Sequence, residues 1–394
     1  YISNFDDFFP LQNGYIKKKI ILKVSDFRSA VIQGKFLAKK GLWVSEYRIE
    51  SGLNCGGHAF ATDGYLMGPI LAEFRDKRQE LIDEIYSVCK SALQTSGKIV
   101  PDNQLSVKIT AQGGVATSEE HNFLIDHYNL DVVGWGTPFL LVPEATTVDS
   151  KTRKQLQEAK EKDLYLSNIS PLGVPFNTLK NSTKDIEKFE KIKEGRPGSP
   201  CPRKFLALSN EYGTEGVCTA SRLFQKNKIE ELGMSEDITE KACLCMGLAA
   251  TAVINYDVNT RESKGVSICP GPNMAYFSKE LTLSEMANHI YNDADGVVRS
   301  DRPNMFVNEL SMYLKLLSEK IEENKLSWGR ASEKKLTNFA DNLNNGIDYY
   351  FEMFNNVDNT FNDIKKSVLD SLDSAMHHMH NMQNDISDLI KKNH

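Results

Sequence analysis

The sequence predicts an α/β protein with a parallel sheet, and three observations lead to this fold class. Strand-like and helix-like segments alternate between residues 17 and 135, which is the rhythm of a parallel sheet with crossover helices. The glycine clusters in this region each follow a predicted strand, at the end where such sheets bind ligands. After Leu281 the apolar residues take helical spacing instead.

The first part of the predicted sheet region is a βαβ unit. Residues 17–25 (KKKIILKVS) predict a buried strand, residues 27–41 a helix that ends at a glycine, and residues 42–51 a second strand. From Met67 to Leu93 apolar residues recur at steps of three and four, which predicts one long amphipathic helix.

Two further strands complete the predicted sheet. Residues 105–110 (LSVKIT) and 131–135 (DVVGW) have strand character. Between them, residues 117–129 predict a helix, because Thr117 and Glu120 have the spacing of a capping box. We therefore expect four parallel strands joined by helices.

The rest of the chain divides into a Cys-rich segment and a helical tail. Residues 180–204 are charged and then rich in Gly and Pro, which predicts an exposed excursion or a linker. The tail predicts helices at 305–321 and 334–354, and a last helix with near-heptad apolar spacing from Phe361 to Leu389. We expect this tail to be a helical appendage or an oligomerisation element. The expected domain ranges are 1–180, 181–279 and 280–394.

Composition excludes several classes of partner. The 394 residues carry a formal net charge of -6, so we expect no affinity for nucleic acid or for an anionic membrane surface. No apolar run approaches the roughly 20 residues that a spanning helix needs. Seven scattered cysteines are too few for a secreted disulfide framework, which favours a reducing cytoplasm. A chain that starts at Tyr1 rather than Met predicts a fragment or a processed product.

Three glycine signals follow the second, third and fourth strands: Gly56–Gly57, Gly113–Gly114 and Gly136–Thr137. Consecutive amides without side chains converge on a phosphate, and the following helix adds its positive amino-terminal end. Barrels commonly place such loops after their last two strands. Alternatively, the three signals are only tight turns between strands and helices.

These residues resemble a known group of enzymes. Residues 109–145, ITAQGGVATSEEHNFLIDHYNLDVVGWGTPFLLVPEA, resemble the last two βα units of the FMN-dependent (β/α)8-barrel oxidoreductases, where a GG turn and a G-T turn hold the flavin phosphate. Residues 50–60, ESGLNCGGHAF, resemble the GGH loop of nitronate monooxygenases and the substrate loop of the glutamate synthase flavin domain. Residues 20–25, IILKVS, are similar to the strand whose lysine contacts the flavin.

The resemblance implies the second half of a TIM barrel, an FMN cofactor and a flavin-dependent oxidoreductase with a small-molecule substrate. It covers four of the eight strands that close a barrel. Either a separate polypeptide or a missing segment supplies the first half, or the fold is an open α/β arrangement. The implied flavin-binding residues are Lys23, Asn54, Gly56, Gly57, Gly113, Gly114, Gly136 and Thr137.

His58 and Cys55 are the candidate catalytic residues. In the position of the nitronate enzymes' histidine, His58 is implied to be a general base beside the flavin, and an imidazole suits that role because it titrates near neutral pH. Alternatively, His58 only caps the loop or binds a backbone carbonyl. Cys55 is either a thiol close to the flavin or a small buried loop residue.

Five of the seven cysteines are candidate metal ligands. Thiolates suit zinc or an iron-sulfur cluster, and a cluster would be a one-electron partner for a flavin. Their spacing matches no CxxC knuckle, so ordinary buried cysteines are the alternative. The candidates are Cys201, Cys218, Cys243, Cys245 and Cys269.

Two other functions compete with the oxidoreductase. One is a non-catalytic scaffold or assembly subunit, in which a degenerate half-barrel presents helices to partners. The other is a cysteine-ligated metalloprotein without flavin. Bound FMN and bound metal are the two observations that separate these three hypotheses.

Overall fold

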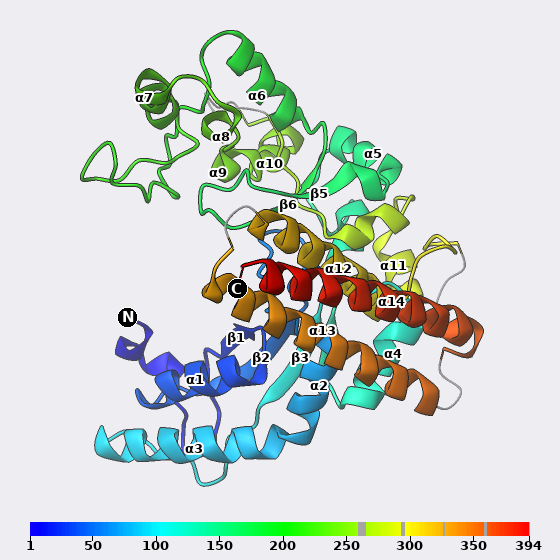
Figure 1. The fold of residues 1–394 in the computed structure, drawn as a ribbon. Coiled ribbons are helices and arrows are strands. Elements are labelled where there is room, and N and C mark those ends of the chain that lie inside the picture. The colour runs from blue at the N-terminus through cyan, green and yellow to red at the C-terminus, as the bar shows by residue number, and fades with distance from the viewer. Residues whose placement is uncertain (259–264, 293–295, 326–327, 358–360, 394) are drawn as a thin grey trace. The chain divides into compact units, whose positions relative to one another are not determined.

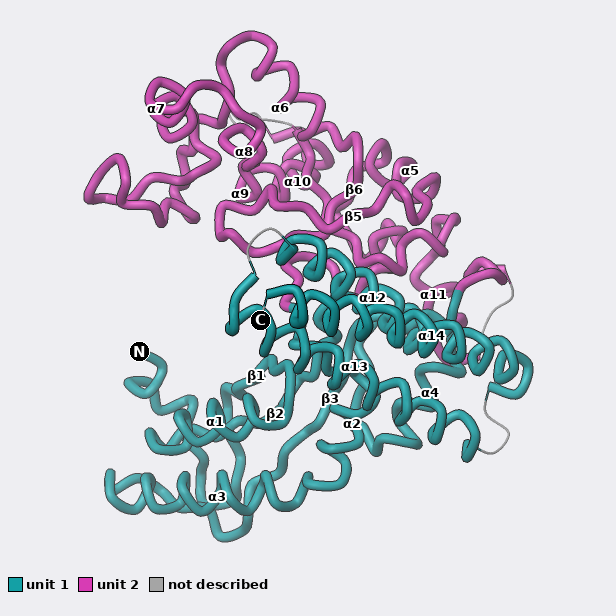
Figure 2. Tube along the Cα trace, viewed as in Figure 1, with its two compact units in different colours: residues 1–53, 61–135, 303–394 teal, residues 54–60, 136–302 magenta. Residues whose placement is uncertain are grey.

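The computed structural model describes residues 1–258, 265–292, 296–325, 328–357 and 361–393. Parts of the predicted Cys-rich segment and helical tail therefore lie outside the described residues, at 259–264, 293–295, 326–327, 358–360 and 394. The chain forms two compact units, each built from separate stretches (Figure 2). Unit 1 contains residues 1–53, 61–135 and 303–394, and unit 2 contains residues 54–60 and 136–302. The chain thus passes from one unit to the other several times.

Unit 1 is built on a four-stranded parallel sheet, as the sequence predicts (Figure 1). The strands pair in the order in which they follow one another in the chain. The third strand is shifted toward its carboxyl end relative to the predicted range and runs through Gln112. The strands are β1 (Ile20–Val24), β2 (Val44–Glu50), β3 (Lys108–Gln112) and β4 (Val132–Gly134).

The two faces of this sheet differ in chemistry. The row Val24, Ile49, Ala111 and Val133 lies on one face and is fully buried. On the other face the registers align three rows of mostly polar residues, which are Ile21, Glu46 and Lys108, then Lys23, Arg48, Thr110 and Val132, then Glu50, Gln112 and Gly134. Ile21 and Val132 remain 49% and 46% exposed. The prediction of a buried first strand is therefore wrong, because β1 lies at the edge of the sheet and only Val24 is buried.

Helices α1 (Phe27–Ala38), α2 (Met67–Asp76), α3 (Arg78–Thr95) and α4 (Ser118–Tyr128) accompany the strands. The prediction of one long helix from Met67 is wrong, because the backbone leaves helical geometry at Lys77. The break lets the two parts pack differently: α3 packs along α1, whereas α2 contacts the C-terminal helices. The apolar residues keep the same spacing through Lys77. The sequence pattern therefore gives no sign that the helices before and after Lys77 pack against different elements.

Side-chain caps fix where the helices of unit 1 begin. Asp26 accepts the Ser29 amide at 2.7 Å at the start of α1. At α4, Thr117 accepts the Glu120 amide at 3.2 Å, which confirms the predicted cap. The Glu120 carboxylate accepts the amides of Ala116 and Met305, at 2.9 and 2.8 Å. It therefore joins the start of α4 to the start of a helix far away in the chain.

Three long helices follow at the C-terminal end of unit 1, as expected: α12 (Met305–Asn324), α13 (Arg330–Asn356) and α14 (Asn362–Asn393). They pack against one another, and α12 and α13 also contact α2 (Figure 1). Most of the apolar stripe predicted for the last helix is buried against this set. The buried members are Phe361, Val368, Leu372, Met379, Met382 and Ile386. These residues thus stabilise the chain's own helices, and oligomerisation through them stays a prediction.

A buried carboxyl group joins these helices to the sheet region of unit 1. Glu309 of α12 is 2% exposed. It accepts hydrogen bonds from the Ser51 hydroxyl at 2.6 Å and from the Met67 amide at 2.8 Å. The Tyr350 hydroxyl donates to it at 3.4 Å and is also the acceptor for the Gly68 amide. Burial raises the pKa of Glu309 to about 7, although these hydrogen bonds oppose the rise.

Unit 2 is mostly short helices and loops around a small antiparallel pair, β5 (Leu164–Ser167) and β6 (Phe176–Leu179). Within residues 180–204, which were predicted to form an exposed excursion or a linker, residues 183–193 form the helix α6 with a Ser182–Asp185 capping box. The other helices of unit 2 are α5 (Ser150–Glu158), α7 (Arg222–Leu232), α8 (Glu236–Thr239), α9 (Leu244–Gly247), α10 (Ala250–Asn255) and α11 (Leu283–Asn292). The 3-10 turns of the chain are η1 (Ile2–Asn4), η2 (Asp6–Phe8), η3 (Thr137–Leu141), η4 (Glu161–Asp163) and η5 (Pro272–Tyr276).

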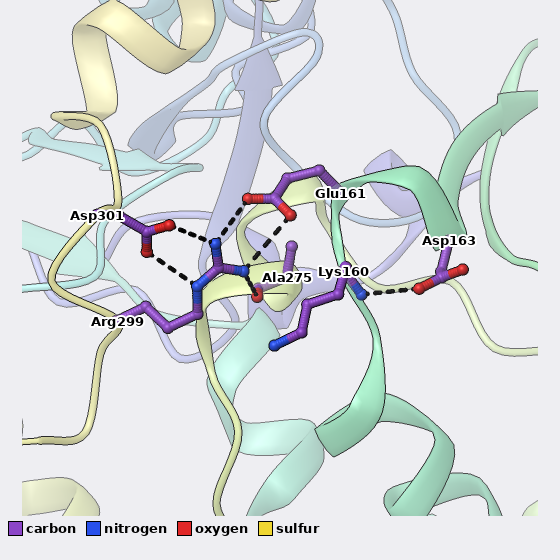
Figure 3. Close-up of polar contacts among 6 residues, drawn as sticks. All are labelled: Lys160, Glu161, Asp163, Ala275, Arg299 and Asp301. Carbon is purple, nitrogen blue, oxygen red and sulfur yellow. Dashed lines mark hydrogen bonds and ion pairs between the residues drawn. The ribbon is translucent and has the colours of Figure 1, made fainter.

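One arginine ties three segments of unit 2 together (Figure 3). The Arg299 guanidinium donates to Asp301 at 2.6 and 2.9 Å and to Glu161 at 3.1 and 3.4 Å. It also donates to the Ala275 carbonyl at 3.0 Å and lies over the ring of Tyr276, 5.2 Å from its centroid. Because the guanidinium is planar, it can satisfy two carboxylates and a carbonyl at once.

We expect Arg299→Ala to loosen the η5 segment without unfolding unit 2. Amide hydrogen exchange at residues 272–276 should accelerate roughly two- to fivefold, which is the effect of losing an exposed ion pair. Arg299→Lys is the matched control, since it keeps the charge and loses the planar fork. Its exchange should fall between wild type and Arg299→Ala, and unchanged exchange in both variants would show that the network has no stabilising role.

Candidate functional site

Polar side chains connect the carboxyl ends of three neighbouring strands in unit 1. Lys23 of β1 forms an ion pair with Glu50 of β2, and Gln112 of β3 donates to the same carboxylate at 2.8 Å. Lys23 is about half exposed, and the Glu50 side chain is only 15% exposed. The edge thus offers an ammonium group to solvent, held in place by a more deeply buried carboxylate. Sequence reasoning identified Lys23 but missed Glu50 and Gln112, whose partners lie on other strands.

A glycine pair, Gly113–Gly114, directly follows Gln112 at the carboxyl end of β3. Gly113 and Gly114 have φ values of 113° and 88°, a region that side-chain-bearing residues rarely adopt. The next strand end is also shaped around Gln112, because a Cβ on Gly134 would lie 3.0 Å from the Cβ of Gln112. The backbone at the end of β3 is therefore specified by glycine, as a loop that presents its amides requires.

The loop 54–60, which leaves β2, belongs to unit 2 and is held there by backbone contacts. The Asn177 side-chain amide donates to the Cys55 carbonyl at 2.7 Å, and the Asn177 backbone amide donates to the Gly57 carbonyl at 2.9 Å. The Gly57 amide in turn donates to the Cys269 carbonyl at 3.2 Å. Asn54 is buried. The loop is thus fastened on both sides, by β6 and by the segment around Cys269.

His58 has two defined neighbours in unit 2. Its Nε2 atom is hydrogen bonded to the Ser170 hydroxyl at 2.7 Å, and its ring meets the edge of Phe176 at a centroid distance of 4.9 Å. A Ser–His pair at this distance is also the geometry of a nucleophile and its base. However, Ser170 is fully buried and its hydroxyl also accepts the Leu172 amide at 3.2 Å. Ser170 is therefore placed to orient the imidazole and not to attack a substrate.

The predicted phosphate-binding glycines of unit 2 differ in how closely other atoms surround them. A Cβ on Gly56 would lie 2.4 Å from the Cys269 carbonyl, so this glycine serves packing within the unit. A Cβ on Gly57 or Gly136 would meet no atom within 4 Å. Thr137 accepts the Gly271 amide at 3.2 Å through its hydroxyl, which retains its own proton for donation.

Four of the five predicted metal ligands lie together in unit 2. Cys201, Cys218 and Cys243 lie near enough to interact electrostatically. Cys245 interacts with Cys201 and Cys243. Burial raises the pKa of the Cys218 thiol to about 12 and also raises the pKa values of Cys243 and Cys245. All seven cysteines of the chain are free thiols.

Cys269 is placed elsewhere in unit 2. It packs against the cluster of Ile169, Phe176, Ala242 and Leu244, and its carbonyl holds the 54–60 loop. Cys55, in the same loop, is half-buried. Across the described residues, no three His, Cys, Asp or Glu side chains already converge at metal-binding geometry. Any metal at the four-cysteine group therefore requires side-chain rotation.

A surface hollow of about 850 Å³ lies between α4 and α13 in unit 1. Arg75, Asp126, His127 and Tyr349 contribute to its lining. Burial lowers the pKa of His127, and the neighbouring Arg75 lowers it further, so its imidazole is neutral at pH 7. Sequence reasoning gave no signal for this hollow, because its residues come from helices far apart in the chain.

Comparison with known proteins adds no assignment. No protein-family model matches the sequence, and a search of curated proteins gives no significant match. Among the helices of the described ranges, none combines the length and the apolarity needed to cross a membrane. Function must therefore be argued from the two units themselves.

Proposed function

We propose that the chain is the C-terminal half of an FMN-dependent (β/α)8-barrel oxidoreductase that acts on a small-molecule substrate. The observation that carries the proposal is the order of the sheet, in which parallel strands neighbour one another in chain sequence. A (β/α)8 barrel has this sequential order, whereas a doubly wound sheet reverses direction at a switch point. Residues 109–145 resemble the last two βα units of the FMN-dependent barrels, and this resemblance implies that the cofactor is FMN.

The loop after β3 fits a phosphate. Gly113 and Gly114 hold left-handed backbone that frees their amides from side chains, and Thr117 begins α4 a few residues later. A helix start close to a glycine turn favours an anion. We propose that this loop binds the flavin phosphate.

The polar edge of the sheet fits the isoalloxazine end of the same cofactor. Lys23 stands half exposed at this edge, with Glu50 holding its position. An ammonium there would favour negative charge on the flavin pyrimidine, and the flavin when bound supplies the transfer of a hydride to or from the substrate.

His58 is proposed to be the general base, with Ser170 as its positioning residue. The hydrogen bond with Ser170 and the edge contact with Phe176 fix the imidazole plane. A histidine held in this way can accept a proton from substrate carbon at neutral pH. Cys55 is proposed to border the same site, where its carbonyl is anchored by Asn177.

The polar face of the sheet supports completion of the barrel by other strands. The rows through Lys23 and Glu50 are only partly covered, and Ile21 and Val132 remain about half exposed on the same face. A barrel closes this face with four further strands. We propose that these strands come from the remainder of the protein or from a partner polypeptide, and that the complete enzyme works in the cytoplasm.

The test is flavin content of the complete protein. We expect a yellow protein that releases FMN on denaturation, and Gly114→Asp should empty the site, because it places a carboxylate and a side chain beside the phosphate. Gly97→Asp is the matched control, since Gly97 also has positive φ, 65°, and lies in another turn of unit 1. Absence of FMN from the wild type, or equal flavin content in both variants, would contradict the proposal and favour the non-catalytic scaffold.

A further inference from the structure

The loop 54–60 leaves unit 1 after Leu53, and the chain returns to unit 1 at Ala61. One end of the loop is preceded by Ser51, directly after β2, and the other is followed by the stretch 61–67, which leads into α2. Helix α12, which also belongs to unit 1, holds both of these ends by hydrogen bonds. The path of the loop therefore depends on a helix that forms much later in the chain.

The Glu309 carboxylate uses its two oxygens on the two ends. Its Oε1 atom accepts the Ser51 hydroxyl at 2.6 Å, and its Oε2 atom accepts the Met67 amide at 2.8 Å. All three residues are buried. Because a carboxylate accepts hydrogen bonds through both oxygens, one side chain joins the residue before the loop to the residue after it.

Tyr313 lies one helical turn after Glu309 and therefore on the same side of α12. Tyr313 is fully buried. Its hydroxyl accepts the Thr62 amide at 3.0 Å and is also hydrogen bonded to the Thr62 hydroxyl at 3.0 Å. The returning chain is thus held by α12 at Thr62 as well as at Met67.

Helix α13 contacts the same returning stretch. The Asn342 side-chain amide donates to the Asp63 carbonyl at 2.8 Å. Gly64 has a φ of 88°, and a Cβ on it would lie 2.4 Å from the Phe339 carbonyl oxygen. The backbone of this stretch is therefore shaped for close contact with the C-terminal helices.

Packing alone explains this turn of α12 less well. Two apolar side chains would pack against the neighbouring helices without the cost of burying a carboxyl group and a hydroxyl. Apolar contact is also non-directional, whereas hydrogen bonds to backbone amides have a preferred distance and angle. Directional control of the two loop ends is what Glu309 and Tyr313 add to packing.

We propose that Glu309 and Tyr313 are positioning residues, which hold both ends of the 54–60 loop and so restrain the loop that carries Cys55 and His58. We call this pair the loop clamp. Its catalytic meaning rests on the proposed oxidoreductase, in which His58 is the general base. The clamp itself involves no cofactor, so it can be tested without flavin.

Tyr313→Phe tests the loop clamp by removing one hydroxyl group. The Gly57 and Ala59 amides lie within the loop and are hydrogen bonded to carbonyl groups of unit 2. Their hydrogen exchange in the full chain should accelerate about fivefold, which is the effect of losing one hydrogen bond. Tyr86→Phe is the matched control, because it removes a hydroxyl that donates to the Asn103 carbonyl from α3. Loop exchange that Tyr313→Phe leaves at the level of the control would overturn the proposal.

Thiol alkylation distinguishes a local clamp from a general loss of stability. Cys55 lies in the loop and is half-buried, whereas Cys89 of α3 is fully buried. Iodoacetamide should modify Cys55 several-fold faster in Tyr313→Phe than in the wild type, and Cys89 at an unchanged rate, as measured by mass spectrometry of the peptides. An equal increase at both cysteines would mean that Tyr313 only stabilises unit 1, and it would contradict the clamp.

Substitutions at Glu309 add a conservative rescue. Glutamine keeps an oxygen that accepts the Met67 amide and gains an amide group that can donate to Ser51, so Glu309→Gln should retain slow loop exchange. Glu309→Ala loses both contacts and should accelerate exchange at least as much as Tyr313→Phe. Equally fast exchange in the two Glu309 variants would count against the clamp. If Glu309→Ala does not fold, the comparison of Tyr313→Phe with Tyr86→Phe decides.

A kinetic measurement links the loop clamp to the proposed reaction. In the complete protein with bound FMN, Tyr313→Phe should lower kcat about fivefold at unchanged FMN occupancy, in proportion to the lost hydrogen bond. Unchanged kcat would show that the clamp does not position His58. A protein without FMN whose loop exchange still responds to Tyr313→Phe would refute the oxidoreductase alone, whereas bound FMN with unresponsive loop exchange would refute the clamp alone.

Discussion

Replacing Glu309 with glutamine should remove a pH-dependent loss of stability that the wild-type protein shows between about pH 4.5 and 7. Burial raises the pKa of this carboxyl from 4.5 to about 7 in the folded state. Below pH 4.5 the group is protonated in both folded and unfolded chains. Between the two pKa values the unfolded chain releases its proton while the folded chain keeps it, so stability falls as pH rises through this window. The fall amounts to at most about 3 kcal/mol.

Tryptophan fluorescence during urea unfolding measures this effect in the right part of the molecule. Trp43, Trp135 and Trp328 all belong to unit 1, as does Glu309. We expect Glu309→Gln to be nearly independent of pH between 5 and 8, because an amide has the same shape and does not titrate. Glu323→Gln, at an exposed position of the same helix, is the control and should follow the wild type. A wild-type midpoint that does not fall across this range would refute the expectation.

Glu309→Ala should be more damaging than the glutamine variant at every pH. It removes the acceptor for the Met67 amide, the Ser51 hydroxyl and the Tyr350 hydroxyl. Leaving buried donors without an acceptor costs about 1–3 kcal/mol each, less where a donor finds a second partner. The same fluorescence measurement should place the alanine variant well below the glutamine variant. Equal stability of the two would mean that these hydrogen bonds contribute nothing.

The second large effect is expected at His58. If it is the general base, His58→Ala should lower kcat by on the order of 100-fold or more, while FMN occupancy, read from the visible absorbance of the complete protein, stays near the wild-type level. Lost turnover and lost flavin in equal measure would make His58 structural, which is the alternative that its contact with Phe176 supports.

Ser170→Ala is the matched variant for this experiment. It removes the hydrogen bond that orients His58 and leaves the imidazole in place. We expect a smaller loss of kcat than in His58→Ala, because the base stays in place but loses its fixed orientation. We also expect a shift in the pH dependence of kcat, because the lost hydrogen bond changes the proton affinity of the imidazole. A Ser170 variant as inactive as His58→Ala, with an unchanged pH profile, would not fit a positioning role.

Local signals in the sequence predicted local structure well. The four parallel strands and the cap at Thr117 follow from residues that are neighbours in the chain. The break at Lys77 was missed because the apolar spacing of the predicted helix continues through it. A continuous amphipathic pattern does not distinguish one helix that packs on one element from two helices that pack on different elements.

Residues that act over long sequence separations were the ones that sequence reasoning missed. Glu309 is a charged residue within an apolar helix, and such a residue usually faces solvent; only the fold reveals the amide and hydroxyl groups that surround it. Likewise, Glu50 gains its role from partners on β1 and β3. The cysteine group was suspected from clustering alone, because the pairing of Ser199 with Ser221 that joins its members has no signature in the spacing.

The hydrogen bond between Ser51 and Glu309 joins residues 258 positions apart in the chain, and this separation has a consequence during synthesis. A ribosome adds about 5–20 residues per second. Ser51, at the end of β2, is therefore synthesised roughly 10–50 s before Glu309 of α12, the acceptor of its hydrogen bond. Throughout that interval the polar end of β2 must remain hydrated. The high contact order of this closure also predicts slow refolding.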